Sequence, residues 1–253
     1  MREVVLLQKI YRKNDLRKIK EILDSLCEGL KVRLEDLSVV ENEWIKVRVS
    51  GEDEKVAVRL LERDVGLAPI SRETVESFSL MRGKILASRR DKGVLVDIGI
   101  FLPRPIYASI SLRRLQGQLI DGKKFALSRI VELFGLTKGF PLEIFISGAH
   151  KDAFKAELAE SQLELYGEWT NSRIDRLLIL GALSREVKKA IRKARLVRDV
   201  LRVEPLGIFE HAMICKLGTD ASGLVPKLGR FIARAEFVCF SPRRILEVTE
   251  GRW

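Results

Sequence analysis

The chain has 253 residues, of which 46% are hydrophobic, enough for one large core or a few small ones. Its formal net charge of +11 says nothing about fold but favours a polyanionic partner, with nucleic acid ahead of an anionic membrane surface. A surface made soluble by lysine is the simpler alternative. No apolar run approaches the roughly 20 residues that span a bilayer, and the charged N-terminus is unlike a signal peptide. The cysteines Cys27, Cys215 and Cys239 form no disulfide framework, so we expect a cytoplasmic protein.

Residues 1–66 predict a small α/β module with the order β-α-β-β-α. Its first helix is expected to run from an N-cap at Asn14 to a stop at Gly29, because apolar residues recur on one face. Residues 44–50 alternate between apolar and basic side chains, which is the period of a strand. Helical spacing returns after them, and residues 66–78 are predicted to be a linker.

Residues 79–168 predict a barrel of five short strands with an insertion after the third. The strands are expected in MRGKILAS, GVLVDIGI, IYASISL, PLEIFIS and FKAELAESQLELY. Residues 113–139, between the third and fourth strands, are expected to be helix or loop. This arrangement is typical of an OB fold.

The barrel segment resembles an S1 domain, the RNA-binding subclass of OB folds. The residues that carry the resemblance are Gly83-Lys84-Ile85, then Gly93-Val94-Leu95-Val96-Asp97-Ile98-Gly99, then Ile106-Tyr107-Ala108-Ser109-Ile110-Ser111. Tyr107 falls where the third-strand aromatic belongs in that family. Leu95 replaces the second-strand aromatic and Ser109 replaces a histidine, and these are two side chains that S1 domains use to stack bases.

Residues 169–253 predict a helical connector followed by a small C-terminal α/β module, which completes a multi-domain α+β protein. RIDRLLIL is interpreted as a helix that ends at Gly181, and Ser184 as the cap of a second helix that reaches about Leu201. The pair would form either a helix-turn-helix that places its second helix in a DNA groove or a two-helix hinge with a basic outer face. A strand (FEHAMICKL), a glycine-rich turn, a short helix and a last strand (AEFVCF) follow.

The turn GTDASG, residues 218–223, has the glycine spacing of a phosphate-binding loop. Leu224 and Val225 stand where that loop requires Lys and Ser or Thr, so we interpret the stretch as a strand-to-helix turn capped by Thr219 or Asp220. Binding of an anion at the start of the following helix is the alternative interpretation. With this motif, the whole layout is similar to a conserved archaeal family of uncharacterised proteins, a resemblance that implies a domain order but no activity.

Metal binding and catalysis find little support in the sequence. His211 and Cys215 share a face of one predicted strand and Cys239 lies on another, which gives three ligands where a zinc site usually needs four. Cysteines that pack as small hydrophobes are the expected alternative. His150 is interpreted as a loop residue. The sequence therefore predicts no catalytic residue, cofactor or metal, and no enzyme; an RNA-processing enzyme would need a clustered acidic or metal site.

Charge distribution carries the functional prediction. Residues 81–130 hold eleven Lys and Arg against three acids, a net charge of +8, and residues 131–170 have a net charge of −4. Residues 181–200 have a net charge of +5 on a helix with an apolar face. The predicted nucleic-acid-binding residues are Arg89, Arg90, Lys92, Arg104, Tyr107, Arg113, Arg114, Lys123, Lys124, Lys188, Lys189, Arg192 and Lys193. Cations would hold phosphates and Tyr107 would stack a base, with Phe101 either a second stacking ring or a core residue.

We expect non-catalytic binding of RNA or single-stranded nucleic acid, by an accessory factor in RNA metabolism, transcription or translation. The alternative is a protein-interaction scaffold that docks on a ribosome or RNA polymerase, which the substitutions at Leu95 and Ser109 favour. For the basic helix alone, lying on a membrane ranks third after the helix-turn-helix and the two-helix hinge, and no membrane partner is predicted.

Overall fold

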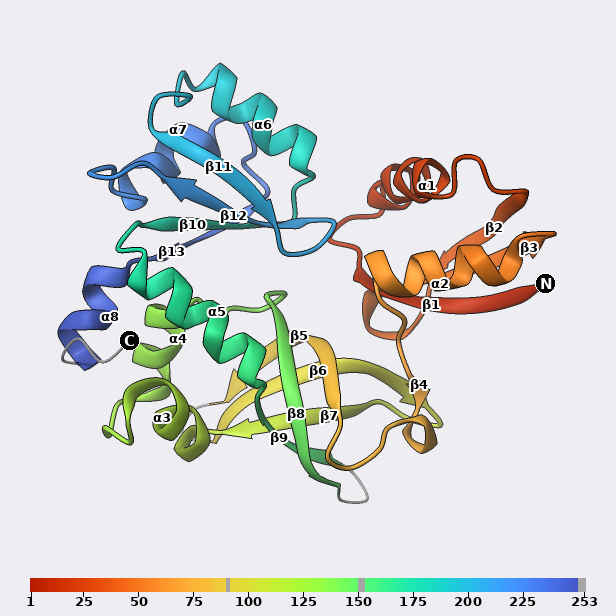
Figure 1. Ribbon diagram of the computed structural model, residues 1–253, viewed down its shortest axis with the longest axis horizontal. Helices are drawn as coiled ribbons and strands as arrows, with labels where there is room; N and C mark the ends of the chain where they lie inside the picture. Colours follow the sequence, from red (N-terminus) through yellow and green to blue (C-terminus); the bar gives the residue numbers. More distant parts are fainter. Residues whose placement is uncertain (90–91, 150–152, 250–253) are drawn as a thin grey trace. The chain divides into compact units, whose positions relative to one another are not determined.

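The computed structural model of the protein describes residues 1–89, 92–149 and 153–249. It is an α+β protein with an N-terminal three-stranded sheet, a central five-stranded barrel and a C-terminal four-stranded sheet. The chain divides into two compact units, the first comprising Met1–Glu76 and Ile98–Ile106, the second the rest of the described chain. Figure 1 shows the elements of each unit. The boundaries 1–66, 79–168 and 169–253 stay predictions.

The first unit contains the predicted β-α-β-β-α order. Its elements are β1 (Arg2–Lys9), α1 (Asp15–Leu26), β2 (Val32–Val39), β3 (Trp44–Gly51) and α2 (Glu54–Asp64). The antiparallel sheet has the order β1-β3-β2, with both helices packed against it. The alternation in β3 is confirmed, because Val47 and Val49 are fully buried while Lys46 and Arg48 form ion pairs with Glu3.

Two details of the first unit differ from the expectation. Asn14 stands at the N-cap of α1 but makes no capping hydrogen bond; Asp15 accepts the backbone N–H of Tyr11 instead. Residues 66–78 are more than a linker, since they contain β4 (Ile70–Ser71), which pairs in parallel with β6, and a 3-10 turn at Arg72–Thr74. Phe101 packs against the buried cluster that contains Trp44, which makes it a core residue rather than a stacking surface.

The next elements along the chain form the barrel, to which residues 98–106 of the first unit also contribute. Its elements are β5 (Leu80–Arg89), β6 (Gly93–Leu102), β7 (Ile106–Ser111), α3 (Leu112–Ile120), α4 (Leu127–Phe134), β8 (Pro141–Ala149) and β9 (Ala153–Leu158). The strand order β6-β5-β8-β9-β7 is closed by pairing between β6 and β7, and the helices form the predicted insertion. Closure requires glycine at Gly93, which has a φ of +126° and whose added Cβ would lie 2.0 Å from the carbonyl oxygen of Ile110.

The last predicted barrel strand is partly wrong. FKAELAESQLELY was expected to be one strand, but β9 ends at Leu158 and the chain continues as helix α5 (Glu160–Asn171). Gln162, Tyr166 and Trp169 are buried at helical spacing. Burial of this one face favours a helix over a strand. The apolar residues of the stretch fit both periods, so the sequence pattern alone did not separate them.

The C-terminal sheet corrects the interpretation of RIDRLLIL as a helix. The elements are β10 (Arg176–Leu180), α6 (Ser184–Lys193), β11 (Val200–Pro205), β12 (Glu210–Cys215), α7 (Val225–Gly229), β13 (Glu236–Phe240) and α8 (Pro242–Thr249). RIDRLLIL supplies β10, an inner strand of the antiparallel order β11-β12-β10-β13, so the helix-turn-helix is excluded. The second helix ends at Lys193 and not near Leu201, which belongs to β11.

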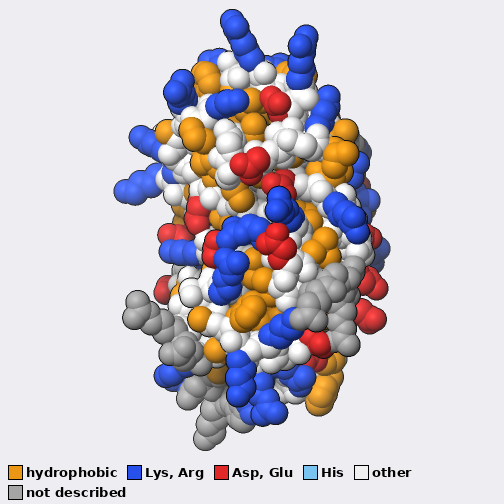
Figure 2. Space-filling view, turned by 90° about the vertical axis from the view of Figure 1, so that its left-hand side faces the viewer, with side chains coloured by type: hydrophobic (Ala, Val, Ile, Leu, Met, Phe, Trp, Pro, Cys, Tyr) orange, Lys and Arg blue, Asp and Glu red, His pale blue; other side chains and the backbone are white. Residues whose placement is uncertain are grey.

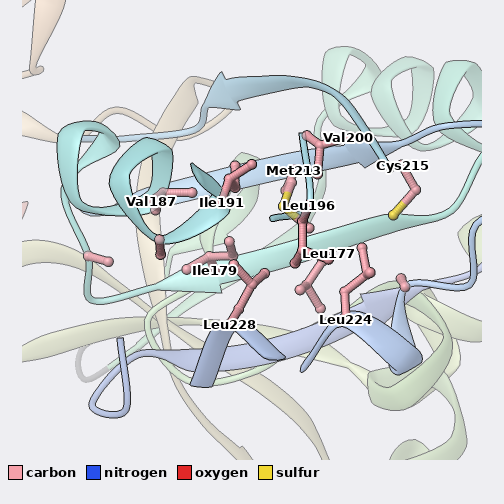
Figure 3. Close-up of a cluster of buried hydrophobic side chains, with 13 residues drawn as sticks. Leu177, Ile179, Val187, Ile191, Leu196, Val200, Met213, Cys215, Leu224 and Leu228 are labelled. Carbon is pink, nitrogen blue, oxygen red and sulfur yellow. The ribbon is translucent and has the colours of Figure 1, made fainter. Parts of the chain in front are cut away.

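Both faces of this sheet are covered, which explains why β10 is an unbroken apolar run. On one face, Leu177 and Ile179 pack with Val187 and Ile191 of α6 and with Leu228 of α7, as Figure 3 shows. The opposite face packs against α5, which follows the barrel, and against the end of α4, which lies in the insertion. There, Phe240 stacks on Tyr166 of α5, and Gly135 at the end of α4 approaches Leu178 so closely that an added Cβ would lie 2.6 Å from its Cδ1.

Candidate nucleic-acid interface

The barrel presents fewer free cations than its sequence suggests. Arg89, Lys92, Arg113 and Lys124 are exposed, and none forms a salt bridge to another residue in the described ranges. Arg90 and His150 lie outside the described residues. Arg104 is exposed but belongs to the segment 98–106 of the first unit, so it lies in a different unit from the other predicted cations. Tyr107 is half-buried on β7, opposite Ala153 of β9.

Acids from the next segment of the chain neutralise several barrel cations. The ion pairs are Arg82–Glu143 at 2.8 Å, Arg114–Glu157 at 3.1 Å and Arg129–Glu132 at 3.1 Å. A hydrogen bond from the Ser161 hydroxyl, followed by the interaction with Arg82, holds the pKa of Glu143 below its usual value. Three acids of residues 131–170 therefore pair with cations of residues 81–130, and two of these pairs join residues far apart in the sequence.

Two further barrel lysines are structural. The Lys84 Nζ lies 2.6 Å from Glu210 Oε1, and both side chains are buried, so this ion pair joins β5 of the barrel to β12 of the C-terminal sheet. Lys123 donates a hydrogen bond from Nζ to the backbone oxygen of Val248 in α8, at 2.9 Å. Neither lysine is positioned as an exposed phosphate contact.

Helix α6 carries a different kind of basic surface. Its first turn is capped by Glu186, whose carboxylate accepts the backbone N–H of Leu183 at 2.9 Å. Val187, Ala190 and Ile191 are buried against the sheet. The predicted residues Lys188, Lys189, Arg192 and Lys193 are all on the other side, and none forms a salt bridge within the described chain.

Helix α7 extends this surface with residues that the sequence reasoning missed. Lys227, Arg230 and Arg234 lie in α7 or just after it, outside the buried core, and have no acidic partner among the residues described. Because α6 and α7 pack on the same sheet face, their outer side chains share one layer. The missed signal is that residues 225–235 contain three basic residues and no acid. In Figure 2, Lys and Arg side chains outnumber acidic ones at the top, where α6 and α7 lie.

We call this layer the helical basic surface. It comprises Lys188, Lys189, Arg192, Lys193, Lys227, Arg230 and Arg234. Side chains three or four residues apart on a helix lie roughly 5–6 Å apart at Cβ, so one backbone can contact several of them in succession.

The glycine-rich turn before α7 is a structural device. It was predicted to join a strand to a helix, and it does join β12 to α7. Asp220 accepts the backbone N–H of Ser222 at 3.0 Å, and Asp175 accepts that of Ala221 at 3.3 Å while also accepting the Ser241 hydroxyl. Two N–H groups of this turn are thus bound to the protein's own carboxylates, which argues against an anion site in the turn.

His211, Cys215 and Cys239 belong to the strands of the same sheet. Cys215 belongs to the core between the sheet and the helices, Cys239 packs against that core, and burial raises the pKa of Cys215 to about 12. His211 is buried, its Nε2 lies 3.0 Å from the carbonyl oxygen of Ala182, and desolvation lowers its pKa. In the described part of the chain, no group of three or more His, Cys, Asp or Glu side chains is arranged to hold a metal ion.

Comparison with known families identifies both terminal modules. Residues 3–68 match the DUF2110 N-terminal domain and residues 174–240 match the DUF2110 C-terminal domain. The chain belongs to the DUF2110 family. The two matches together span more than half of the chain, and between them lies the barrel of this DUF2110 protein. Within the described ranges, none of the helices is long and apolar enough to span a membrane.

Other comparisons add no functional information. No curated protein matches the chain. Among solved structures, a crystal structure of a Thermus thermophilus protein aligns with 98% of this chain at 13% sequence identity and a TM-score of 0.18. The chain spans 42% of that protein, and a TM-score this low supports no conclusion about fold or function.

Proposed function

We propose that this DUF2110 protein binds RNA or single-stranded nucleic acid without catalysing a reaction on it, as an accessory factor in RNA metabolism, transcription or translation. The observation that carries the proposal is the helical basic surface, whose seven cations lie outside the core and have no salt-bridge partner among the described residues. Unpaired cations are available to replace the counterions of a phosphate backbone. The exposed barrel cations Arg89, Lys92, Arg113 and Lys124 would make weaker, secondary contacts.

The expected binding is electrostatic and depends on salt. For a single strand, the logarithm of the binding constant falls with the logarithm of salt with a slope of about −0.7 per phosphate contact. Five contacts would weaken binding on the order of 100-fold between about 50 and 200 mM salt. A protein that docks through apolar contacts would show a much smaller dependence.

The test is a fluorescence-anisotropy titration of labelled single-stranded RNA at these two salt concentrations. One variant carries Lys188→Glu, Lys189→Glu, Arg192→Glu and Lys193→Glu. A matched variant carries four identical charge reversals on the barrel, at Arg89, Lys92, Arg113 and Lys124. We expect a loss on the order of 100-fold for the first variant, which removes four phosphate contacts, and a few-fold loss for the second, because the barrel contacts are weaker. Each lost contact should also remove about 0.7 from the salt slope.

Two outcomes would reject the proposal. One is the absence of binding by the wild-type protein at the lower salt concentration. The other is equal affinity of the wild-type protein and the α6 variant, with circular dichroism showing that both are folded. None of the eight reversed side chains is buried, so the variants are expected to keep their fold.

A protein-interaction scaffold is the second candidate, and one observation favours it. Phe78 is 72% exposed and Leu80 is 69% exposed, and the Phe78 ring lies 6.4 Å from that of Phe145. The pairs Arg82–Glu143 and Arg114–Glu157 neutralise nearby charges, and an apolar centre with paired charges is suited to a protein partner. Affinity capture before and after nuclease treatment separates the candidates: partners retained after nuclease, and lost from Phe78→Ser, would favour the scaffold.

A further inference from the structure

Two aromatic side chains are exposed in the described part of the chain, Phe78 and Phe231. Phe78 contacts Phe145 on the outside of the barrel, in the region where Arg82 and Arg114 are bound to glutamates. Phe231 has a different setting. It follows α7, between Arg230 and Arg234, and makes no ring contact with another described residue.

Phe231 lies next to the residues that anchor α7 to the core. Leu228 is fully buried in the core beneath α7, and Ile232 packs against the same core. The backbone N–H of Phe231 donates a hydrogen bond to the carbonyl oxygen of Leu228 at 2.9 Å, so helical winding continues through this turn. Phe231 is three residues after Leu228, so it lies at the margin of this inward-directed face, where its side chain remains 45% exposed.

An exposed ring among unpaired cations has a specific use in nucleic-acid binding. Every base has a flat π-face, but in a duplex the neighbouring base pairs cover it. A phenylalanine ring on a basic surface can therefore stack on an unpaired base, while cations beside it hold the flanking phosphates. Arg230 and Arg234 are the cations beside Phe231, and Lys227 lies one turn earlier on α7.

We infer that Phe231 stacks on a base, and that the helical basic surface consequently selects single strands over duplexes. The inference rests on the proposed function and adds to it the form of the nucleic acid and the residue that recognises it. It also assigns the role first expected of Tyr107 to a ring on a different domain, next to cations that have no acidic partner in the described ranges.

The test compares three proteins and two ligands. Wild type, Phe231→Leu and Phe231→Trp are titrated with a single-stranded RNA and with a duplex of the same length. Leucine keeps an apolar side chain but has no π-face, so we expect it to weaken single-strand binding roughly tenfold, within the range known for stacking on one ring. Tryptophan has a π-face, so Phe231→Trp should keep the wild-type affinity for the single strand. Duplex binding and the salt slope should not change, because the phosphate contacts are intact.

A matched control is Phe78→Leu, which changes the other exposed ring and should leave both affinities unaltered. Equal affinity of wild type and Phe231→Leu for single-stranded RNA would overturn the inference, as would equal losses for strand and duplex. Salt-dependent binding by the wild type with either result would leave the proposed function standing. Absence of binding by the wild type would reject both.

Discussion

The barrel and the helical layer of the C-terminal sheet are both basic in sequence, but they differ in the folded protein. Barrel residues 81–130 have a net charge of +8, and residues 181–200, which include α6, have a net charge of +5. In the barrel, Arg82, Arg114 and Arg129 are bound to glutamates and Lys84 is buried. On α6 and α7, seven cations have no acidic partner in the described chain.

This difference shows why the charge of a segment is a poor measure of its surface potential. The barrel's acidic partners, Glu132, Glu143 and Glu157, come from residues 131–170, which reach the same surface through β-sheet pairing or local helical spacing. A salt bridge leaves little net field for a polyanion to sense, although an exposed pair adds little stability. Although the net charge of the segment that contains α6 is smaller than that of the barrel segment, its cations are more available to bind a polyanion.

The largest expected effect concerns the buried pair that connects the two regions. Lys84→Met should lower the free energy of unfolding by about 3–5 kcal/mol, because it removes the cation of a buried ion pair while the carboxylate of Glu210 stays buried. Urea denaturation followed by circular dichroism measures the change. No substitution of a single exposed barrel cation should approach this value.

The double variant Lys84→Met/Glu210→Leu is the control for this prediction. Removing both charges also removes the cost of burying them, so part of the lost stability should return. A loss below about 1 kcal/mol for Lys84→Met alone would contradict the structural role of the pair.

A smaller effect is expected from His211, beneath the helical layer. Burial lowers its pKa, so below the unfolded value of about 6.5 the unfolded chain binds a proton that the native chain does not. Above about pH 6.5, His211 is neutral in both states and does not reduce the free energy of unfolding. As the pH decreases from there toward the folded pKa, the free energy of unfolding falls by at most about 1.4 kcal/mol per pH unit. Urea midpoints between about pH 7 and 5 measure it, and His211→Gln should remove this part of the pH dependence.

Much of the fold could be predicted from local patterns, and the errors share a physical cause. The alternation in β3 and the glycines of the barrel carry strong local signals. The β10 segment failed because Leu177–Leu180 are apolar on both faces, and a short apolar run is compatible with helix or strand until its covering elements are known. The same ambiguity turned the start of α5 into a predicted strand.

The candidate site was predictable only where its residues are close in the sequence. The four cations of α6 lie within six residues of one helix, Lys188–Lys193, so charge counting found them. Lys227, Arg230 and Phe231 are about forty residues away and join the surface because two helices pack on one sheet face. Ion pairing is also a tertiary property, so the neutralisation of Arg82 and Arg114 was not visible in the sequence.

The smallest expected effect tests whether ion pairing is what limits the barrel's contribution to binding. Glu143→Gln with Glu157→Gln removes the acids that hold Arg82 and Arg114, and leaves every cation in place. Affinity for single-stranded RNA should rise about threefold at low salt, and the salt slope should steepen by about 1, because two cations become available for at most two phosphates. The same substitutions in the background of the α6 reversal should restore part of the lost binding. If affinity does not change in either background, something other than ion pairing limits the barrel's contribution to binding, and the contrast between the two regions would need a steric explanation.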